Sequence, residues 1–367
     1  MPTDIAESFA PGVVVGGCRI ESFVAVGGFG VVYRARGPDG RTVAVKVAKL
    51  PTTSLSAREL LLQQNEIEAL IRLQHPSLVD VKSYGVLPDG RMYLVTEFVE
   101  GQVLKRYLAD KGALDALEAT RLVRRIAEAL AYCHESNVLH LDLKPANIII
   151  ADPYEPRIKV LDFGLARITG GFRKRGSISR GGTLEYMAPE CFAGTGGGDP
   201  YSARADLYAL GVIFYEMLAG GLPFRPGLSL GALMEAKKAG RMLPLDSAAP
   251  QVPRPVVKLV HSLLSPEPAH RFSSAAALAT RLKSLYYDAL HGDPGGAAQD
   301  LSGLEDEPGA ADAPFVGRFA ELVAVRSAVG AVAGGKAGAL AIVGEAGIGK
   351  SRLISEALSG TQGLSML

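Results

Sequence analysis

The apolar residues along the chain predict two kinds of element, a helix from their spacing and a strand from a run of β-branched residues. Between residues 120 and 134 they fall at positions 122, 123, 126, 127, 130 and 131, the spacing of a helix that packs against a core. Residues 42–45 (TVAV) form a β-branched run that is typical of a strand. Residues 205–222 are apolar over a longer stretch, but this run contains Glu216 and is too short and too polar to cross a membrane. The pattern predicts a domain of mixed helices and strands with no membrane-spanning segment.

Near residue 290 this patterning stops. Residues 291–314 read HGDPGGAAQDLSGLEDEPGAADAP, with no periodicity, few apolar positions and several acids. Such a composition is typical of a flexible linker, which we place at residues 289–313. An apolar run at residues 339–343 (ALAIV) predicts a further strand beyond the linker. A chain of 367 residues is therefore expected to hold two folded parts.

Four short motifs in the first part carry candidate chemistry. Residues 43–46 read VAVK, residues 140–147 read HLDLKPAN, residues 162–164 read DFG and residues 188–190 read APE. This is the order of parts that transfers a phosphoryl group from ATP to a hydroxyl. With these motifs, roughly residues 20–286 resemble the bacterial members of the eukaryotic-type Ser/Thr protein kinase family.

The resemblance implies an α+β, bilobal protein-kinase fold. Its N-terminal lobe would hold an antiparallel sheet plus a helix, and its C-terminal lobe would be mainly helical. We assign residues 1–17 to an N-terminal tail and residues 18–288 to the kinase domain. Residues 205–222 would then be the buried central helix of the family, with Asp206 capping the backbone of the catalytic loop.

The chemistry of phosphoryl transfer suggests roles for residues of these motifs. Mg²⁺ prefers hard oxygen ligands, so Asn147 and Asp162 are expected to hold it against the phosphates of ATP. Asp142 is the candidate base that accepts the proton of the substrate hydroxyl. Lys144 would place positive charge near the γ-phosphate. In the family, a Lys at this position and a Thr such as Thr183 before the APE motif accompany Ser/Thr specificity.

Lys46 stands at the end of the predicted strand. The resemblance implies that it holds the α- and β-phosphates and pairs with a Glu on the next helix, roughly residues 57–73. Glu66 lies nine residues before His75, which is the family's spacing, and is our assignment. Glu59, two turns earlier on nearly the same helix face, is the alternative.

The remaining ATP-binding positions are also implied by the resemblance. Glycines before Lys46 would let the backbone approach the phosphates, although Ala25 replaces the first glycine of the family pattern. Backbone groups of the hinge would bond the adenine edge next to a small gatekeeper, Thr96, and apolar side chains would enclose the purine. The glycines are Gly27, Gly28 and Gly30, the hinge residues are Glu97 and Val99, and the enclosing side chains are Val32, Ala44 and Ile149.

The chain departs from the family pattern at a second position, and this change affects the expected regulation. The family's His-Arg-Asp motif reads His140-Leu141-Asp142 here. The Arg normally pairs with a phosphate on the activation loop, and leucine cannot form that pair. We therefore expect activity that does not depend on loop phosphorylation. Arg271 is implied to form a structural ion pair with Glu190.

Beyond the linker, residues 344–351 read GEAGIGKS, a full Walker A sequence directly after the predicted strand. Its backbone amides would cradle phosphates, with the Lys on the β- and γ-oxygens and the Ser on Mg²⁺. The expected site residues are Gly344, Gly347, Gly349, Lys350 and Ser351. Together with FVGR at residues 315–318, residues 314–367 resemble the start of an AAA-type signal-transduction NTPase. No Walker B acid follows, so we expect a truncated, incomplete α/β P-loop segment, the front of a longer protein.

The expected function is that of an ATP-dependent Ser/Thr protein kinase in signal transduction, fused to an NTPase regulatory module. Its partners would be proteins with Ser or Thr hydroxyls, with autophosphorylation among its expected reactions. The alternative is a catalytically weak pseudokinase scaffold that relays nucleotide state to the NTPase module. Ala25 and Leu141 favour that alternative, whereas the retained Lys46, Asp142 and Asp162 oppose it.

The net charge and the cysteine content indicate which partners and which cellular compartment to expect. The net charge of +1 gives no support for nucleic-acid binding. The activation segment, residues 162–190, is basic, either as a solvated loop or as a docking surface for anionic partners. Cys18, Cys133 and Cys191 are far apart without ligand spacing, which indicates a reducing compartment. Since no signal peptide is visible either, we expect a cytoplasmic location.

Overall fold

The computed structural model describes residues 9–27, 30–51, 67–68, 70–152, 157–162, 184–193, 201–291 and 325. The chain divides into two compact units, residues 1–299 and 300–367, and the description below concerns the first. Several predicted features lie outside the described residues: the linker, the P-loop segment, and the individual positions Gly28, Glu59, Glu66 and Thr183.

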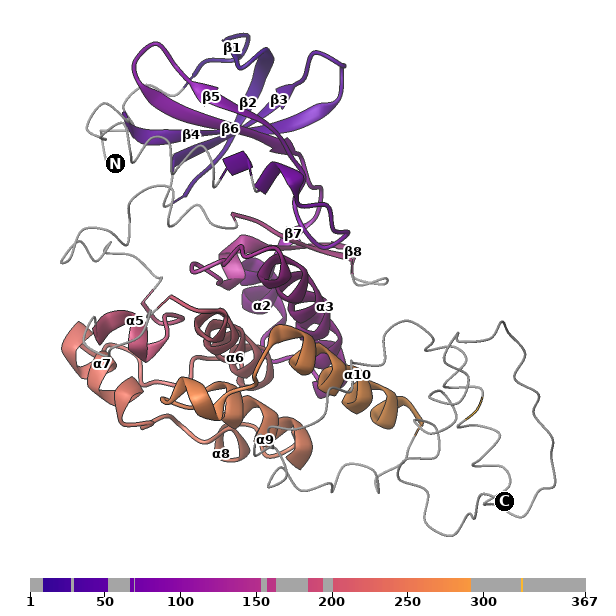
Figure 1. Ribbon diagram of the computed structural model, residues 1–367, viewed down its shortest axis with the longest axis vertical. Coiled ribbons are helices and arrows are strands. Elements are labelled where there is room, and N and C mark those ends of the chain that lie inside the picture. The colour runs from indigo at the N-terminus through magenta and orange to yellow at the C-terminus, as the bar shows by residue number, and fades with distance from the viewer. Residues whose placement is uncertain are drawn as a thin grey trace. The chain divides into compact units, whose positions relative to one another are not determined.

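The N-terminal part of this unit is an antiparallel sheet (Figure 1). Its strands follow the order β1-β2-β3-β4-β6-β5. They are β1 (Val14–Val15), β2 (Cys18–Val26), β3 (Gly30–Arg36), β4 (Thr42–Pro51), β5 (Val81–Val86) and β6 (Arg91–Glu97). The β-branched run at 42–45 thus lies in a strand, as predicted, and β4 sits between β3 and β6.

The side chains of β4 point alternately to its two faces, one facing the core and the other facing the candidate site. Val43, Val45 and Val47 are buried in one hydrophobic cluster, which also contains Tyr33 of β3. Side chains of a strand alternate between its faces, so Ala44 and Lys46 lie on the opposite face. Lys46 is paired in register with Val32 of β3, and Ala44 with Thr96 of β6. Pairing in register places the predicted ATP-binding residues of three strands on one face of the sheet.

The following part is mainly helical, as predicted (Figure 1). Its helices are α2 (Leu104–Lys111), α3 (Ala116–Glu135), α5 (Pro189–Ala193), α6 (Ala203–Ala219), α7 (Leu230–Lys238), α8 (Leu245–Ala248), α9 (Arg254–Leu263) and α10 (Ala275–His291), with 3-10 turns η2 (Pro145–Asn147) and η3 (Pro268–His270). Asp115 caps α3 by accepting a hydrogen bond from the backbone N–H of Glu118. The helix buries the apolar positions that predicted it, from Leu122 to Leu130. None of the described helices is long and apolar enough to cross a membrane.

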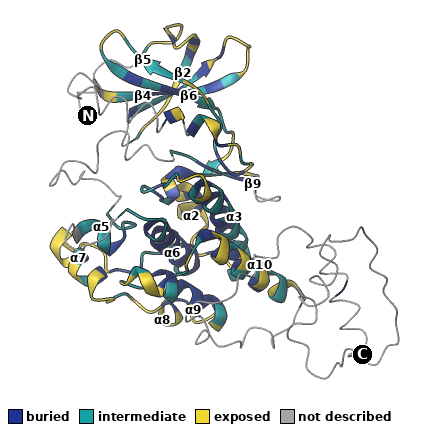
Figure 2. Ribbon diagram, viewed as in Figure 1, coloured by how far each residue is buried: buried dark blue, intermediate teal, exposed yellow. Residues whose placement is uncertain are grey.

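Helix α6 is the centre of the helical part. Almost every residue from Ala205 to Leu218 is buried, and Figure 2 shows this helix dark blue among partly exposed neighbours. Gly211 lets α9 approach closely, because a Cβ at this position would lie 2.6 Å from the Cβ of Leu263. The resemblance correctly implied a buried central helix at this position.

A small sheet positions the catalytic motif at residues 140–147 and the carboxylate residue Asp162. It has the order β7-β8-β9, with β7 (Gln102–Val103), β8 (Ile148–Asp152) and β9 (Arg157–Val160). The catalytic motif at 140–147 leads into β8, and Asp162 follows directly after β9. Because β8 and β9 pair antiparallel, Asn147 and Asp162 come together at one end of this sheet, where the N–H of Leu161 donates to the carbonyl of Asn147 at 2.8 Å.

Candidate active site

A buried carboxylate holds the backbone of the catalytic motif. Asp206 of α6 accepts hydrogen bonds from the N–H groups of His140 at 2.9 Å and of Leu141 at 2.7 Å. The Nε2 of His134 lies 2.9 Å from the same carboxylate. Burial raises the pKa of Asp206, but these contacts with His134 and His140 outweigh burial and hold the pKa below its ordinary value. The predicted cap is therefore present, with an additional partner, His134, that the sequence did not reveal.

His140 joins the catalytic motif to the strand that leads to Asp162. Its side chain is fully buried, and burial lowers its pKa, so the ring is neutral at physiological pH. Its Nδ1 lies 3.3 Å from the N–H of Asp142 and accepts from it, so Nε2 carries the proton and donates to the carbonyl of Leu161 at 3.0 Å. Sequence reasoning gave His140 no role. Its contacts fix Asp142 and Leu161 relative to each other.

The candidate base lies in a network of two further motif residues. The Nζ of Lys144 lies 2.9 Å and 2.7 Å from the two carboxylate oxygens of Asp142. The Nδ2 of Asn147 donates to the carbonyl of Asp142 at 2.9 Å and to its carboxylate at 3.2 Å. The roles of these three residues were predicted separately, and in the structure Lys144 and Asn147 both contact Asp142. The carboxylate is held in a fixed orientation before any substrate arrives.

Lys46 and Asp162 form an ion pair between the sheet and the loop after β9, with Nζ and Oδ2 at 2.6 Å. The sequence assigned Lys46 to phosphates and to Glu66, so the pair with Asp162 was not predicted. Asp162 has a φ of +62°, a region that non-glycine residues rarely occupy and that recurs at functional sites. The pair brings together the residue predicted to contact the phosphates and a residue predicted to bind Mg²⁺.

One position of the predicted glycine loop has no room for a side chain. A Cβ at Gly30 would lie 1.8 Å from the carbonyl oxygen of Val47, a distance that no side chain tolerates. A Cβ at Gly27 would make only an ordinary contact, 3.8 Å from the carbonyl oxygen of Gly30, and the N–H of Gly27 donates to that oxygen at 2.8 Å. Ala25 pairs in register with Val32 and does not have a positive φ, so a side chain is accommodated where the family pattern has its first glycine.

The hinge is anchored by a lysine that sequence reasoning missed. The Nζ of Lys159 on β9 contacts the carboxylate of Glu97 at 2.6 Å and the carbonyl of Leu78 at 2.8 Å. The same carboxylate accepts from the N–H of Asp80 at 2.9 Å. These contacts hold the Glu97 side chain. The contact with adenine that was predicted for Glu97 concerns its backbone groups and not this side chain.

The residues expected to enclose adenine are neither fully buried nor fully exposed. Val32, Ala44 and Ile149 are each partly exposed, whereas each has a buried apolar neighbour in its own strand. Apolar side chains of this intermediate kind are typical of a ligand cleft.

The end of the activation segment is fixed to the helical part. Both terminal nitrogens of Arg271 bind the carboxylate of Glu190, at 2.7 Å and 2.8 Å, as the resemblance implied. The hydroxyl of Tyr186 donates to the carboxylate of Glu216 at 2.7 Å. The segment that ends in the APE motif therefore has a defined position beside α6.

The oxygen atoms at this site suit Mg²⁺. Both hydrogens of the Asn147 amide point at Asp142, so its side-chain oxygen is the atom left for a cation, and its backbone carbonyl is bonded to Leu161, the residue before Asp162. No cluster of three or more His, Cys, Asp or Glu ligands occurs among the residues that the structure describes. Mg²⁺ in ATP sites needs none, because phosphates and waters supply most of its ligands.

Comparison with known proteins agrees with this geometry. Residues 19–282 match the family described as protein kinase domain. The chain is 33% identical over 282 residues to the serine/threonine-protein kinase pkn3 of Myxococcus xanthus, covering 73% of this chain and 49% of that protein. It is 31% identical over 290 residues to the serine/threonine-protein kinase PknJ of Mycobacterium tuberculosis, covering 77% of this chain and 48% of that protein. The crystal structure of the Mycobacterium tuberculosis PknI kinase domain superposes with a TM-score of 0.59 at 26% identity, covering 76% of this chain and 99% of that one. The chain spans about half the length of the curated relatives that it matches.

Proposed function

The chain belongs to the protein kinase family, and we propose that it transfers the γ-phosphate of ATP to Ser and Thr hydroxyls of proteins. The observation that carries this proposal is one continuous network of contacts. It runs from Lys46 through Asp162 to the adjacent Leu161, on to Asn147, and from Asn147 to Asp142 and Lys144. The residues proposed as the base, the phosphate contact and the Mg²⁺ ligands are linked to one another by these contacts, which supports the proposal.

Each residue of the network has a defined task in this reaction. Asp142 accepts the proton of the attacking hydroxyl, and its carboxylate is oriented for this by Lys144 and Asn147. Lys46 places its ammonium on the phosphates, and Lys144 balances the charge that develops during transfer. When bound by Asp162 and Asn147, Mg²⁺ supplies further charge neutralisation at the phosphate oxygens.

Ser/Thr specificity is part of the proposal. Lys144 follows Asp142 by two residues, and it contacts that carboxylate directly. Thr183, which the resemblance pairs with this Lys in Ser/Thr kinases, is proposed to complete the site.

We expect the protein to transfer ³²P from ATP to myelin basic protein, and phosphoamino-acid analysis to find label on serine and threonine. Label on tyrosine would contradict the specificity. ATP binding by calorimetry, combined with no transfer to any protein, would favour the pseudokinase scaffold. That alternative rests on Ala25 and Leu141.

Turnover is expected to resist removal of activation-loop phosphate. Leu141 replaces the Arg that reads such a phosphate, and its backbone is held by Asp206 instead. The measurement compares kcat before and after phosphatase treatment, and we expect a change below about twofold. A fall of tenfold or more, about 1.4 kcal/mol on the barrier, would show that another basic group reads the phosphate.

The second part of the chain extends the proposal to regulation. We propose that residues 314–367 begin an NTPase module whose nucleotide state acts on the kinase in signal transduction. The Walker A sequence from Gly344 to Ser351 supports a second phosphate site. A cytoplasmic location accords with the reducing environment that the cysteine pattern indicates.

A further inference from the structure

A buried lysine lies on a helix that is otherwise open to solvent. Lys237 of α7 is 1% exposed, and Leu233 is the one other buried residue of this helix. Figure 2 shows α7 mostly in the colour of exposed residues. Lysine is almost never buried unless its charge has partners, so this position requires an explanation.

The ammonium group of Lys237 is matched by three backbone carbonyls. Its Nζ lies 3.0 Å from the oxygen of Leu184, 2.6 Å from that of Glu185 and 2.7 Å from that of Met187. Only the protonated amine carries three hydrogens, so the arrangement is that of an ammonium donating all three. Burial lowers the pKa of Lys237 to about 7, and Glu185 opposes this effect.

Aromatic rings complete the surroundings of this cation. The Nζ lies 5.2 Å from the ring centre of Tyr208, 5.4 Å from that of Phe224 and 5.8 Å from that of Phe192. Cations are attracted to ring faces at such distances. Tyr208 also lies under the guanidinium of Arg271, at 4.8 Å, and Arg271 binds Glu190. Two cations on neighbouring elements therefore hold the same segment, one at residues 184–187 and the other at Glu190.

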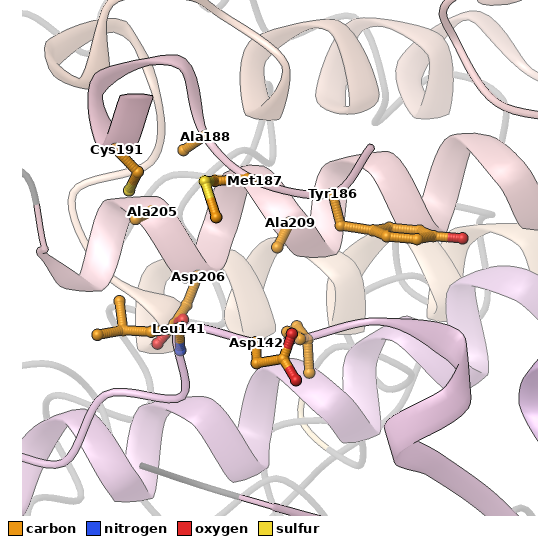
Figure 3. A pocket seen from close by; sticks show the side chains of 10 residues that line it. Leu141, Asp142, Tyr186, Met187, Ala188, Cys191, Ala205, Asp206 and Ala209 are labelled. Carbon is orange, nitrogen blue, oxygen red and sulfur yellow. The ribbon is translucent and has the colours of Figure 1, made fainter. Parts of the chain in front are cut away.

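The held segment faces the catalytic base. Tyr186 and Met187 line a small cavity together with Asp142 and Leu141 (Figure 3). Because this segment lies beside Asp142, we infer that the position of its main chain affects where a substrate peptide can lie.

We propose that Lys237 is a positioning residue that fixes residues 184–187 as the docking platform for the protein substrate. Its three carbonyl bonds hold the platform without a phosphate, in a chain where Leu141 replaces the phosphate-reading Arg. The inference rests on the proposed kinase function for its link to substrate, while the link between Lys237 and the segment stands on geometry alone.

The test compares Lys237→Met with Lys238→Met, because Lys238 is the exposed neighbour on the same helix. Loss of three bonds from a charged donor should raise the KM for myelin basic protein at least about tenfold, with the KM for ATP changing by less than about twofold. Hydrogen–deuterium exchange of residues 184–187 should become at least about tenfold faster, while exchange in α6 and β4 stays unchanged. Lys238→Met should alter neither quantity.

Two results would overturn the inference. One is unchanged exchange at residues 184–187 in Lys237→Met; the other is an equal rise in the KM values for ATP and for protein. If Lys237→Met does not fold, Lys237→Gln keeps two donors and is measured in the same way. If the unmodified protein transfers no phosphate, the proposed function fails, and the exchange experiment still decides whether Lys237 holds the segment.

Discussion

Replacing Asp162 with asparagine is expected to lower phosphate transfer by about 10³-fold, roughly 4 kcal/mol on the barrier. The carboxylate supplies the negative charge at the proposed Mg²⁺ site, and an amide cannot replace that charge. Asparagine tolerates positive φ well, so the backbone at +62° should persist. The change therefore removes charge and leaves the local structure in place.

The matched control for this variant is Asp39→Asn, an exposed turn residue between β3 and β4. Turnover and melting temperature are measured for both variants beside the unmodified protein. The control should keep full turnover, and its melting temperature should stay within about 2 °C of the original, since surface changes cost little. Transfer by Asp162→Asn at more than a tenth of the original rate would remove Asp162 from the proposed catalytic site.

Replacing Asp206 with asparagine is expected to destabilise the domain by about 3 kcal/mol, a fall in melting temperature of roughly 6–12 °C. The carboxylate accepts from the backbone of His140 and Leu141 and contacts His134. An amide of the same size offers one acceptor oxygen and turns a donor toward one of these N–H groups. Turnover should fall as well, because the same bonds position the motif that carries Asp142.

The pH dependence of stability gives a second check on Asp206. Its folded pKa is lowered from 3.8, so its contribution is present above that value and is lost as the pH falls through the lower folded pKa. Asp246→Asn, at an exposed position on α8, is the control and should leave the melting curve unchanged within about 2 °C. Equal melting of Asp206→Asn and the unmodified protein at neutral pH would show that the cap contributes no stability.

The sequence predicted those parts of the site whose residues lie close together in the chain. Asp142, Lys144 and Asn147 lie within one short motif, so their convergence follows from the chain's path through η2. Helix α3 was predicted from the spacing of its apolar positions, and strand β4 from its run of β-branched residues. The ion pair between Arg271 and Glu190 came from the family resemblance and is present.

Three of the contacts that sequence reasoning missed join residues far apart in the chain. Lys159 binds Glu97 across 62 positions, and Lys237 binds the segment at 184–187 across at least 50. Neither lysine differs in its sequence surroundings from a solvated one, since the fold alone decides which becomes buried. The pair between Lys46 and Asp162 is similar, because the sequence assigned both residues to ATP and gave no reason to pair them.

The central claim is that Asp142, oriented by Lys144 and Asn147, is the base of a Ser/Thr kinase. The most direct measurement is ³²P transfer from ATP to serine and threonine of myelin basic protein by the unmodified protein and by Asp142→Asn, with ATP affinity measured in parallel. We predict transfer by the unmodified protein and a loss of about 10²–10⁴-fold in the variant at equal ATP affinity. Equal transfer by the two proteins, or ATP binding without transfer by the unmodified protein, would contradict the claim.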